Sequence, residues 1–259
     1  MRMNTKNNYK NYISLGYFCS PALDLERLGI RTASYPFDWL ISDFKGVISA
    51  IETRFNGFLL YENLQQELSN RSIYTDAYYN FHFYHDFDKY IPLSKQITKV
   101  QEKYQRRIAR FYNDIAEPTL FIRYISDETC HNEKSLELSY IEENITNILA
   151  LLKSFNSSND IIFIANSNVV SDKINIYHVN KDYEDVVARQ PLTSNEELNS
   201  FFSDLEIPNK NKNIQRYNNK QKRKNSIIVK LKRKAISFFK RHFLREYNHS
   251  IQYDIHKIV

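Results

Sequence analysis

One of the two cysteines stands where a thiol can act as a nucleophile. Cys19 lies between a short apolar run, residues 12–15, and the segment Ser20-Pro21, which carries helix-start signals. The positive end of a helix dipole favours thiolate over thiol, so this placement predicts a lowered pKa for Cys19. The alternative is a small apolar plug beneath the turn, because cysteine is often buried. Cys19 is therefore a candidate nucleophile for acyl transfer, with a structural role as the competing interpretation.

A cysteine nucleophile needs a base, and histidine is the usual one. Of the seven histidines, His85 is the best placed, because it follows a strand-like segment and precedes an acid, Asp86. Asp86 and Asp38 are both candidates to orient the imidazole. Asp38 lies between two large aromatic side chains, Phe37 and Trp39, where a carboxylate is costly without a partner. A histidine satisfied at a strand end and a turn-capping aspartate are the alternatives that stay open.

Other side chains are candidates to bind a substrate. Two arginines, Arg31 and Arg123, suit an anionic group. Trp39 offers a ring that stacks on a sugar, and Asn166 closes an apolar strand-like run. Ligands of open α/β sheets bind outside the carboxyl ends of the strands. If the strands are parallel, one edge of the sheet gathers Cys19, His85, Asp86, Arg123 and Asn166.

The sequence carries no pattern typical of a metal or cofactor site. His82 and His85, in the segment "HFYHDFD", would point to opposite faces of a strand and would not converge on one ion. Only four glycines occur, and neither the dinucleotide-binding fingerprint nor the P-loop pattern is present. We therefore expect no cofactor and no bound metal.

The segments that must position these residues alternate between strands and helices. The strands are predicted near residues 12–15, 78–87, 119–126, 160–168 and 173–179. The helices are predicted near residues 20–29, 44–55, 94–115, 135–155 and 195–205. This order predicts an α/β protein with three layers and a largely parallel sheet, in which Cys19 occupies the first strand–helix turn. A basic amphipathic helix is expected near the C-terminus.

The charge distribution divides the chain. Residues 1–209 hold 21 Lys and Arg against 28 Asp and Glu, whereas residues 210–259 hold 15 against 2. We therefore expect an α/β domain over 1–207, a basic polar linker over 208–225 and a basic amphipathic tail over 226–259.

The tail predicts a polyanionic partner. Residues 226–245 combine an apolar helical stripe with cationic side chains, which is typical of a helix that docks on an anionic membrane surface. A final helix of the core and a nucleic-acid-binding segment are the alternatives, although no nucleic-acid recognition module accompanies the basic run. The first residues lack an apolar signal-peptide region, so we expect a cytoplasmic protein, peripheral on the inner face of the membrane.

Several short motifs resemble those of a bacterial family labelled putative papain-like cysteine peptidases. The motifs are "SLGYFC", "RTASYPFDW", "HDF" and "LFIR", and the resemblance covers residues 12–165. The family usually carries Asn where this chain has Phe18. The resemblance implies functional roles for the matching positions, which are Cys19, the block 36–39, His85, Asp86 and Arg123.

The resemblance implies acyl-transfer chemistry with a cysteine nucleophile. The alternation of strands and helices is more similar to a Rossmann-type layer, in which Cys19 would occupy the nucleophile position of the GDSL-type serine esterases. Members of the family occur in surface-polysaccharide gene sets, which implies a glycan- or acyl-linked substrate. Hydrolysis and transfer stay open. The alternative function is a glycan-binding or glycosyltransferase-like protein, whose rings would stack on sugars through Tyr35, Trp39, Tyr78 and Tyr79.

Overall fold

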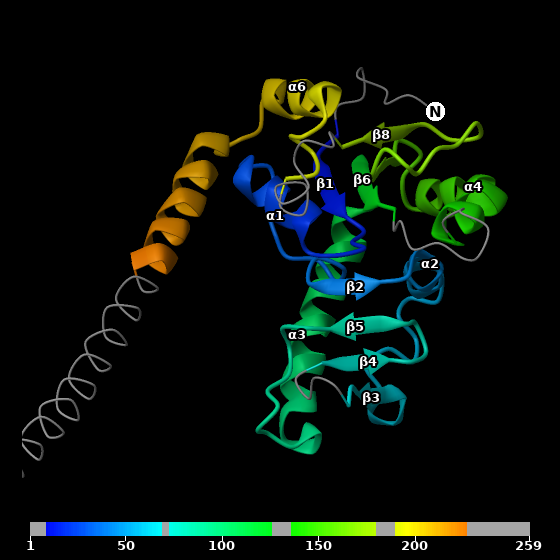
Figure 1. The fold of residues 1–259 in the computed structure, drawn as a ribbon, viewed down its shortest axis with the longest axis vertical. Helices are drawn as coiled ribbons and strands as arrows, with labels where there is room; N and C mark the ends of the chain where they lie inside the picture. Colours follow the sequence, from blue (N-terminus) through cyan, green and yellow to red (C-terminus); the bar gives the residue numbers. More distant parts are fainter. Residues whose placement is uncertain (1–8, 69–72, 126–135, 180–189, 227–259) are drawn as a thin grey trace, which may run out of the picture. The chain divides into compact units, whose positions relative to one another are not determined.

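The computed structural model describes residues 9–68, 73–125, 136–179 and 190–226. The chain divides into two units, Met1–Lys210 and Asn211–Val259. In the described part of the first unit, the strands form two four-stranded sheets, which are stacked one beyond the other in Figure 1.

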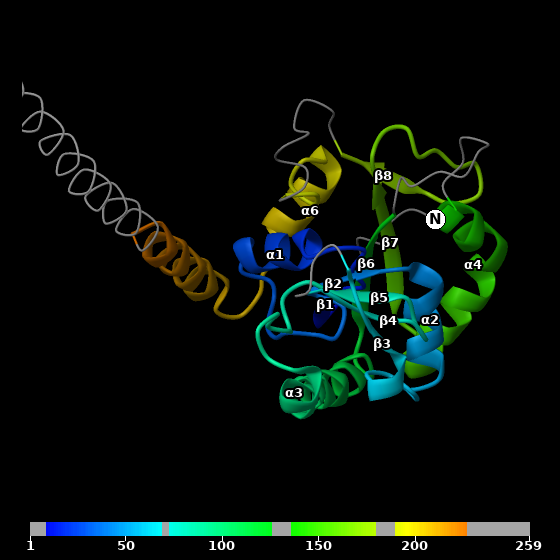
Figure 2. The same cartoon turned by 60° about the horizontal axis from the view of Figure 1, so that its bottom comes forward.

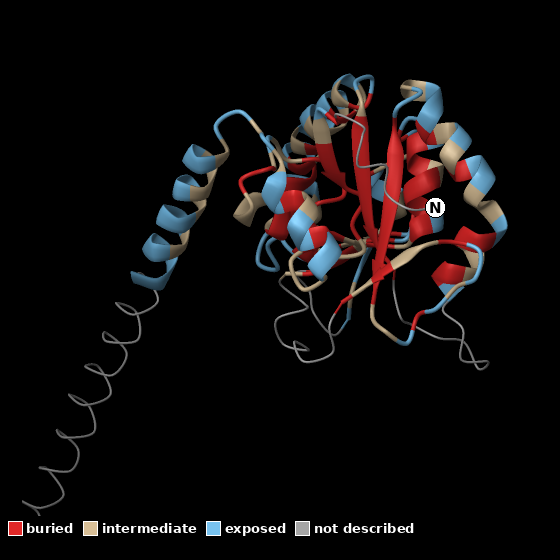
Figure 3. Cartoon of the chain, turned by 90° about the horizontal axis from the view of Figure 1, so that it is seen from above, coloured by how far each residue is buried: buried red, intermediate tan, exposed pale blue. Residues whose placement is uncertain are grey.

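The first sheet is wholly parallel and has the order β1-β6-β7-β8. Its strands are β1 (Asn11–Ser14), β6 (Thr119–Tyr124), β7 (Asp160–Ala165) and β8 (Ile176–His178). Every residue of β6 and β7 is buried, as expected for strands covered on both faces. Figure 3 shows these buried strands between layers of helices that are exposed on their outer sides.

Helices cover both faces of the parallel sheet. Two helices, α1 (Ser20–Arg27) and α6 (Glu196–Asp204), share an apolar core with alternate residues of β6 such as Leu120 and Ile122. On the opposite face lie α2 (Phe44–Glu52), α3 (Leu93–Asp114) and α4 (Leu136–Phe155). Figure 2 shows α1 and α6 on one side of β6 and β7, and α2 and α4 on the other. The predicted α/β class is confirmed, and the protein has a parallel sheet that carries helices on both faces.

The second sheet is antiparallel and has the order β2-β5-β4-β3. Its strands are β2 (Leu40–Ser42), β3 (Leu64–Gln66), β4 (Tyr74–Asp76) and β5 (Phe81–Phe83), with a 3₁₀ turn at Tyr61–Asn63 before β3. Its buried side chains belong to the same core as α2, α3 and α4. The two sheets therefore share one hydrophobic interior.

The sequence predicts that the strand within residues 78–87 joins the parallel sheet, and this placement is wrong. The strand is β5, and it pairs antiparallel with β4 across a turn that contains Asn80 in a left-handed conformation (φ 56°). Phe81 and Phe83 are buried while His82 between them is half-buried. Such alternation is typical of a sheet with one covered face, and it separates β5 from the wholly buried parallel strands.

The stretch expected as a polar linker, residues 208–225, begins with a turn at residues 208–209 and is helical from residue 210. Residues 211–226 of the second unit are helical throughout. All but the first residue of the amphipathic tail expected over 226–259 lies outside the described residues, so its membrane docking stays a prediction. Of the helices that the structure describes, none is both long and apolar enough to cross a bilayer.

Arg123 on β6 joins the two sheets. Its Nε and Nη2 donate to the two carboxylate oxygens of Glu137 on α4, both at 2.7 Å. Its Nη1 donates to Leu15 O after β1 (2.9 Å) and to Ser42 Oγ on β2 (3.0 Å), and Nη2 donates to Ser42 O (2.7 Å). The side chain is 0% exposed. Its hydrogen bonds thus link β1, β2, β6 and α4, and the structure places it in the core instead of in an open binding site.

Replacement of Arg123 by alanine should lower the free energy of unfolding by about 3–5 kcal/mol, because Glu137 would then be buried without a counter-charge. Urea denaturation followed by circular dichroism measures the change. Arg123→Lys keeps the charge but not the planar fork, so an intermediate loss is expected.

The exposed ion pair Lys10–Glu117 supplies the control. Lys10→Ala should change stability by less than about 1 kcal/mol, since surface ion pairs contribute little. A loss for Arg123→Ala as small as that for Lys10→Ala would contradict a linking role.

Candidate functional site

A sharp backbone turn separates β1 from α1. Gly16 (φ 80°) and Tyr17 (φ 60°) are both in the left-handed region, which a tyrosine rarely adopts. A Cβ on Gly16 would lie 2.8 Å from Ser42 Oγ and 3.1 Å from Phe37 O, so the position has no room for a side chain. Tyr17 carries strain of about 1–3 kcal/mol, and strain of this kind gathers at functional sites.

Contacts with neighbouring strands hold the turn in place. Ser42 N donates to Tyr17 O (3.0 Å), and Tyr124 N at the end of β6 donates to Gly16 O (3.4 Å). The Tyr17 ring stacks on Tyr124 with centroids 6.3 Å apart, and Phe18 meets Tyr124 edge-on at 5.0 Å. Tyr124 Oη donates to Asn166 Oδ1 after β7 (2.8 Å). The structure thus brings the turn that carries Cys19 and Asn166 to the same carboxyl edge of the parallel sheet.

Cys19 occupies the N-cap position of α1, one residue earlier than the cap that the sequence indicates. Its carbonyl accepts from Leu23 N (3.0 Å), and its side chain is half-buried. Burial raises the pKa of the Cys19 thiol, although hydrogen bonds from its own backbone and from Ser20 act in the opposite direction. The predicted lowering of this pKa is therefore wrong, because desolvation outweighs the favourable groups at the helix start. A nucleophilic Cys19 would need a base to take its proton.

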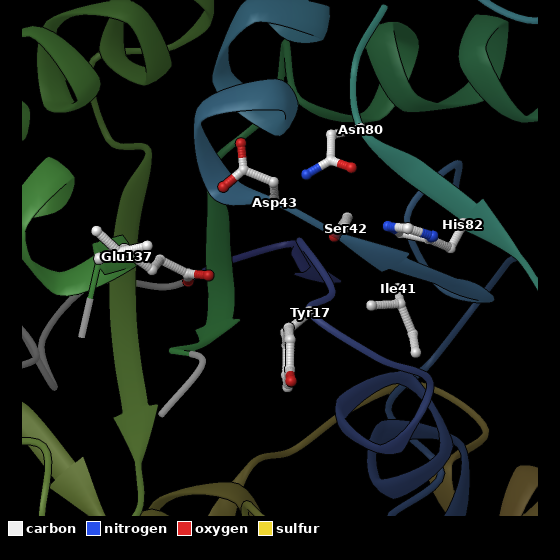
Figure 4. A pocket seen from close by; sticks show the side chains of 8 residues that line it. Tyr17, Ile41, Ser42, Asp43, Asn80, His82 and Glu137 are labelled. Carbon is white, nitrogen blue, oxygen red and sulfur yellow. The ribbon is translucent and has the colours of Figure 1, made fainter. Parts of the chain in front are cut away.

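A cavity of about 220 Å³ lies beside the turn and the outer part of β2. Figure 4 shows its polar side chains, which come from the turn, β2, the β4–β5 hairpin and the start of α4: Tyr17, Ser42, Asp43, Asn80, His82 and Glu137. Asp43 caps α2 by accepting from Gly46 N (3.1 Å), and Glu137 is bonded to Arg123. The imidazole of His82 also lines this wall, and neither of these structural bonds engages it.

His82 is held by two polar neighbours. Its Nδ1 lies 2.9 Å from Thr75 Oγ1 on β4 and 3.7 Å from Glu67 Oε1, a carboxylate that would pair with a protonated ring. The strand register places it opposite Ile41 and Thr75, on the face away from the core. From the sequence, His82 is a candidate only for metal binding. Its position between two buried phenylalanines was the signal for a histidine on the open face of a sheet.

Asp38 is paired with arginine instead of with the predicted imidazole. Its Oδ2 accepts from Tyr35 N (2.8 Å) and from Arg31 Nη2 (2.5 Å). Burial raises the pKa of Asp38, and the charge of Arg31 opposes this effect. The Arg31 guanidinium also lies 5.4 Å from the Trp39 ring centroid. Arg31 and Asp38 therefore form a largely buried pair that positions the loop before β2.

His85 and Asp86 contact different partners. His85 is exposed and meets the Trp39 ring edge-on, with centroids 6.4 Å apart. Asp86 accepts from Tyr104 Oη (2.9 Å) and from Lys103 Nζ, both on α3. Burial, reinforced by the Asp86 charge, raises the pKa of Tyr104. Within the described residues, no hydrogen bond joins His85 to Cys19, Asp38 or Asp86, so the proposed triad is not assembled here and stays a prediction.

The aromatic candidates for sugar stacking differ in access. Tyr35 and Tyr79 are buried, Trp39 is half-buried and Tyr78 is exposed. Among the residues that the structure describes, no group of three His, Cys, Asp or Glu side chains is placed to hold a metal ion. Cys130 lies outside the described residues.

Comparison with known proteins identifies the family. Residues 10–155 match the model of the family described as putative papain-like cysteine peptidase (DUF1796), and the chain belongs to this family. An uncharacterised protein of Acanthamoeba polyphaga mimivirus is 29% identical over 175 residues, which cover 60% of this chain and 77% of the viral protein. No solved structure matches the chain. The family resemblance is confirmed, whereas a bacterial origin is not, since this relative is viral.

Gly16→Ala should lower the free energy of unfolding by about 1–3 kcal/mol, because it combines a left-handed backbone with the contact to Ser42. Gly57→Ala is the matched control, since Gly57 has the same φ of 80° but only ordinary contacts. Gly57→Ala should lower the free energy of unfolding by about 1 kcal/mol. Thermal denaturation of both variants measures the difference, and equal losses would mean that the contact with Ser42 is unimportant.

Iodoacetamide should alkylate Cys19 in the folded protein more slowly at pH 7.5 than it alkylates a free cysteine. The rate should continue to rise above pH 9, because burial keeps the thiol protonated. A Cys130→Ser background leaves Cys19 as the single thiol, and the urea-unfolded protein gives the reference rate. Fast alkylation with a plateau near neutral pH would instead indicate the lowered pKa that the sequence predicts.

Proposed function

We propose that the chain is a cysteine-dependent hydrolase or acyltransferase with Cys19 as its nucleophile. The observation that carries the proposal is the strained Gly16–Tyr17 turn, which presents Cys19 at the start of α1 and at the carboxyl edge of the parallel sheet. A strained turn between a strand and a helix is the arrangement that some hydrolases use to expose a reactive side chain. Membership of the papain-like family supports the same chemistry.

In the proposed reaction, Cys19 Sγ attacks a carbonyl carbon and forms a covalent acyl-enzyme. The thiol proton passes to a base and then to the leaving group, which departs as the carbonyl re-forms. Backbone N–H groups near Ser20 at the start of α1 stabilise the oxyanion of the tetrahedral intermediate. Water, or the hydroxyl of an acceptor, then attacks the acyl-enzyme and releases Cys19. Hydrolysis and transfer use the same residues.

We propose His82 as the base. The Cys19 thiol has a raised pKa, so its proton must be removed during the attack. His82 and Tyr17 line the same cavity, and Tyr17 lies two residues before Cys19 in the sequence. Its Nδ1 is held near Thr75 and Glu67, which leaves Nε2 for proton transfer. His85, the base that the sequence predicts, is more exposed and contacts Trp39.

Cys19→Ala should abolish hydrolysis of a panel of p-nitrophenyl esters, and His82→Ala should lower kcat by about 10²–10⁴-fold. His85→Ala is the direct comparison. Intact-mass measurement should detect an acyl-enzyme in the unsubstituted protein and none in Cys19→Ala. Circular dichroism establishes that each variant is folded.

The outcomes separate the assignments. Full activity in Cys19→Ala would refute the nucleophile. A large loss in His85→Ala together with none in His82→Ala would assign the base to His85 instead.

The sequence supports two finer elements of the proposal. A glycan- or acyl-linked substrate follows from the family resemblance. Docking of residues 226–245 on an anionic membrane follows from the charge distribution, in which residues 210–245 contain no acid. A glycan-binding or glycosyltransferase-like role is the alternative, and an absence of acyl-enzyme in all the assays would favour it.

A further inference from the structure

A second, larger cavity lies between residues 85–91 and one face of α3. Its volume is about 960 Å³, within the range of small-molecule sites. Its wall contains two carboxylates, Asp86 and Asp88, and a larger set of cationic side chains: Lys89, Lys95, Lys99, Lys103 and Arg106. Cys19 does not line this cavity, so a ligand bound here would be separate from the proposed cysteine chemistry.

The cations of α3 are spaced to face the cavity together. Lys95, Lys99 and Lys103 follow one another at intervals of four residues, a spacing at which like charges on a helix repel. Asp86 neutralises Lys103 alone. In the described part of the chain, Lys95, Lys99 and Arg106 have no ion-pair partner within 4 Å, and Glu102 on the same helix does not line the cavity. An anion in the cavity would relieve this repulsion.

The opposite wall is fixed in advance by a buried glutamine. Gln96 Oε1 accepts from Asp88 N (2.8 Å), while its Nε2 donates to Asp88 O (3.0 Å) and Ile91 O (2.7 Å). Asp88 Oδ1 accepts from Tyr90 N (2.8 Å), which directs that carboxylate into its own turn. The loop of residues 88–91 is therefore attached to α3 through Gln96, and a ligand would meet a preformed wall.

Exposed rings adjoin the cationic side chains. Tyr90 is 82% exposed, and Lys89 Nζ lies 5.0 Å from its ring centroid. A neighbouring cavity of about 500 Å³ shares Lys89, Tyr90 and Ile91 with the first and adds Tyr61, which is 56% exposed. Flat rings beside lysines suit a ligand that combines a ring with closely spaced negative charges.

We propose that the cavity between residues 85–91 and α3 binds a nucleoside polyphosphate. The phosphates lie against Lys95, Lys99 and Arg106, whose charges have no protein partner in the described structure. The base stacks on the exposed Tyr90 ring. Lysines serve as point charges for phosphate and impose no fixed geometry, which suits an open cavity of this size.

The single tryptophan makes the site measurable in the full-length protein. Trp39 contacts His85, and His85 lines the cavity. Adenosine triphosphate, inorganic tripolyphosphate and adenosine are titrated separately while Trp39 fluorescence is recorded, and calorimetry repeats each titration. Adenosine triphosphate should bind saturably and most tightly, tripolyphosphate should bind more weakly, and adenosine should bind most weakly. The affinity of the two anions should fall as the salt concentration rises.

Matched variants locate the binding. Lys95→Gln/Lys99→Gln should weaken adenosine triphosphate at least about tenfold, whereas Lys45→Gln, which removes an exposed charge on α2 away from the cavity, should leave it unchanged. Tyr90→Ala should weaken the triphosphate but not tripolyphosphate.

Three results would overturn the proposal. The first is no saturable binding at millimolar concentrations by either method. The second is an equal effect of Lys45→Gln and the double variant, which would indicate a non-specific charge effect. The third is binding of a long single-stranded RNA with none of the small triphosphate, which would indicate a polymer surface.

Discussion

A guanidinium without access to water needs charged and polar partners, and the partners of Arg123 determine where the two sheets meet. It reaches the end of β1 through Leu15 O, the end of β2 through Ser42 and the start of α4 through Glu137. These are the segments that carry Tyr17, Ser42 and Glu137 into the small cavity. The geometry of the candidate site is therefore a consequence of how one buried charge is satisfied.

The turn before Cys19 depends on the same junction. Ser42 donates its amide to Tyr17 O, and its hydroxyl accepts from Arg123, so one residue of β2 contacts both the turn and the charge. Tyr17 also lies under the Arg123 guanidinium, 5.9 Å from its centre. The left-handed conformation of Tyr17 is maintained because its neighbours over-determine it. The strained turn and the buried Arg123 therefore depend on the same contacts, which Ser42 and the Tyr17 ring supply.

The sequence predicts the regular parts of the fold well and the polar partnerships poorly. The strands β6 and β7 and the helix α3 carry long, unambiguous apolar patterns, and the structure confirms them. In the antiparallel sheet, β2, β3 and β4 escape prediction because each has only three residues, too few for a periodic signal, whereas β5 is predicted as a strand but assigned to the wrong sheet. The partners of Asp38 and Asp86 lie on other elements, and only the tertiary structure shows that they are Arg31 and Lys103. The sequence predicts the wrong direction for the Cys19 pKa because it shows a helix start but not the desolvation of the thiol.

The shared interior has a consequence for how the first unit opens. The buried side chains of β2, β4 and β5 belong to the same apolar cluster as those of α2, α3 and α4, so the antiparallel sheet has no separate core of its own. Parting the sheets would also expose the paired charges of Arg123 and Glu137 without replacing their partners. Partial openings that release one sheet alone are therefore costly, so the backbone amides of β5 and β6 are expected to exchange with solvent through the same cooperative event.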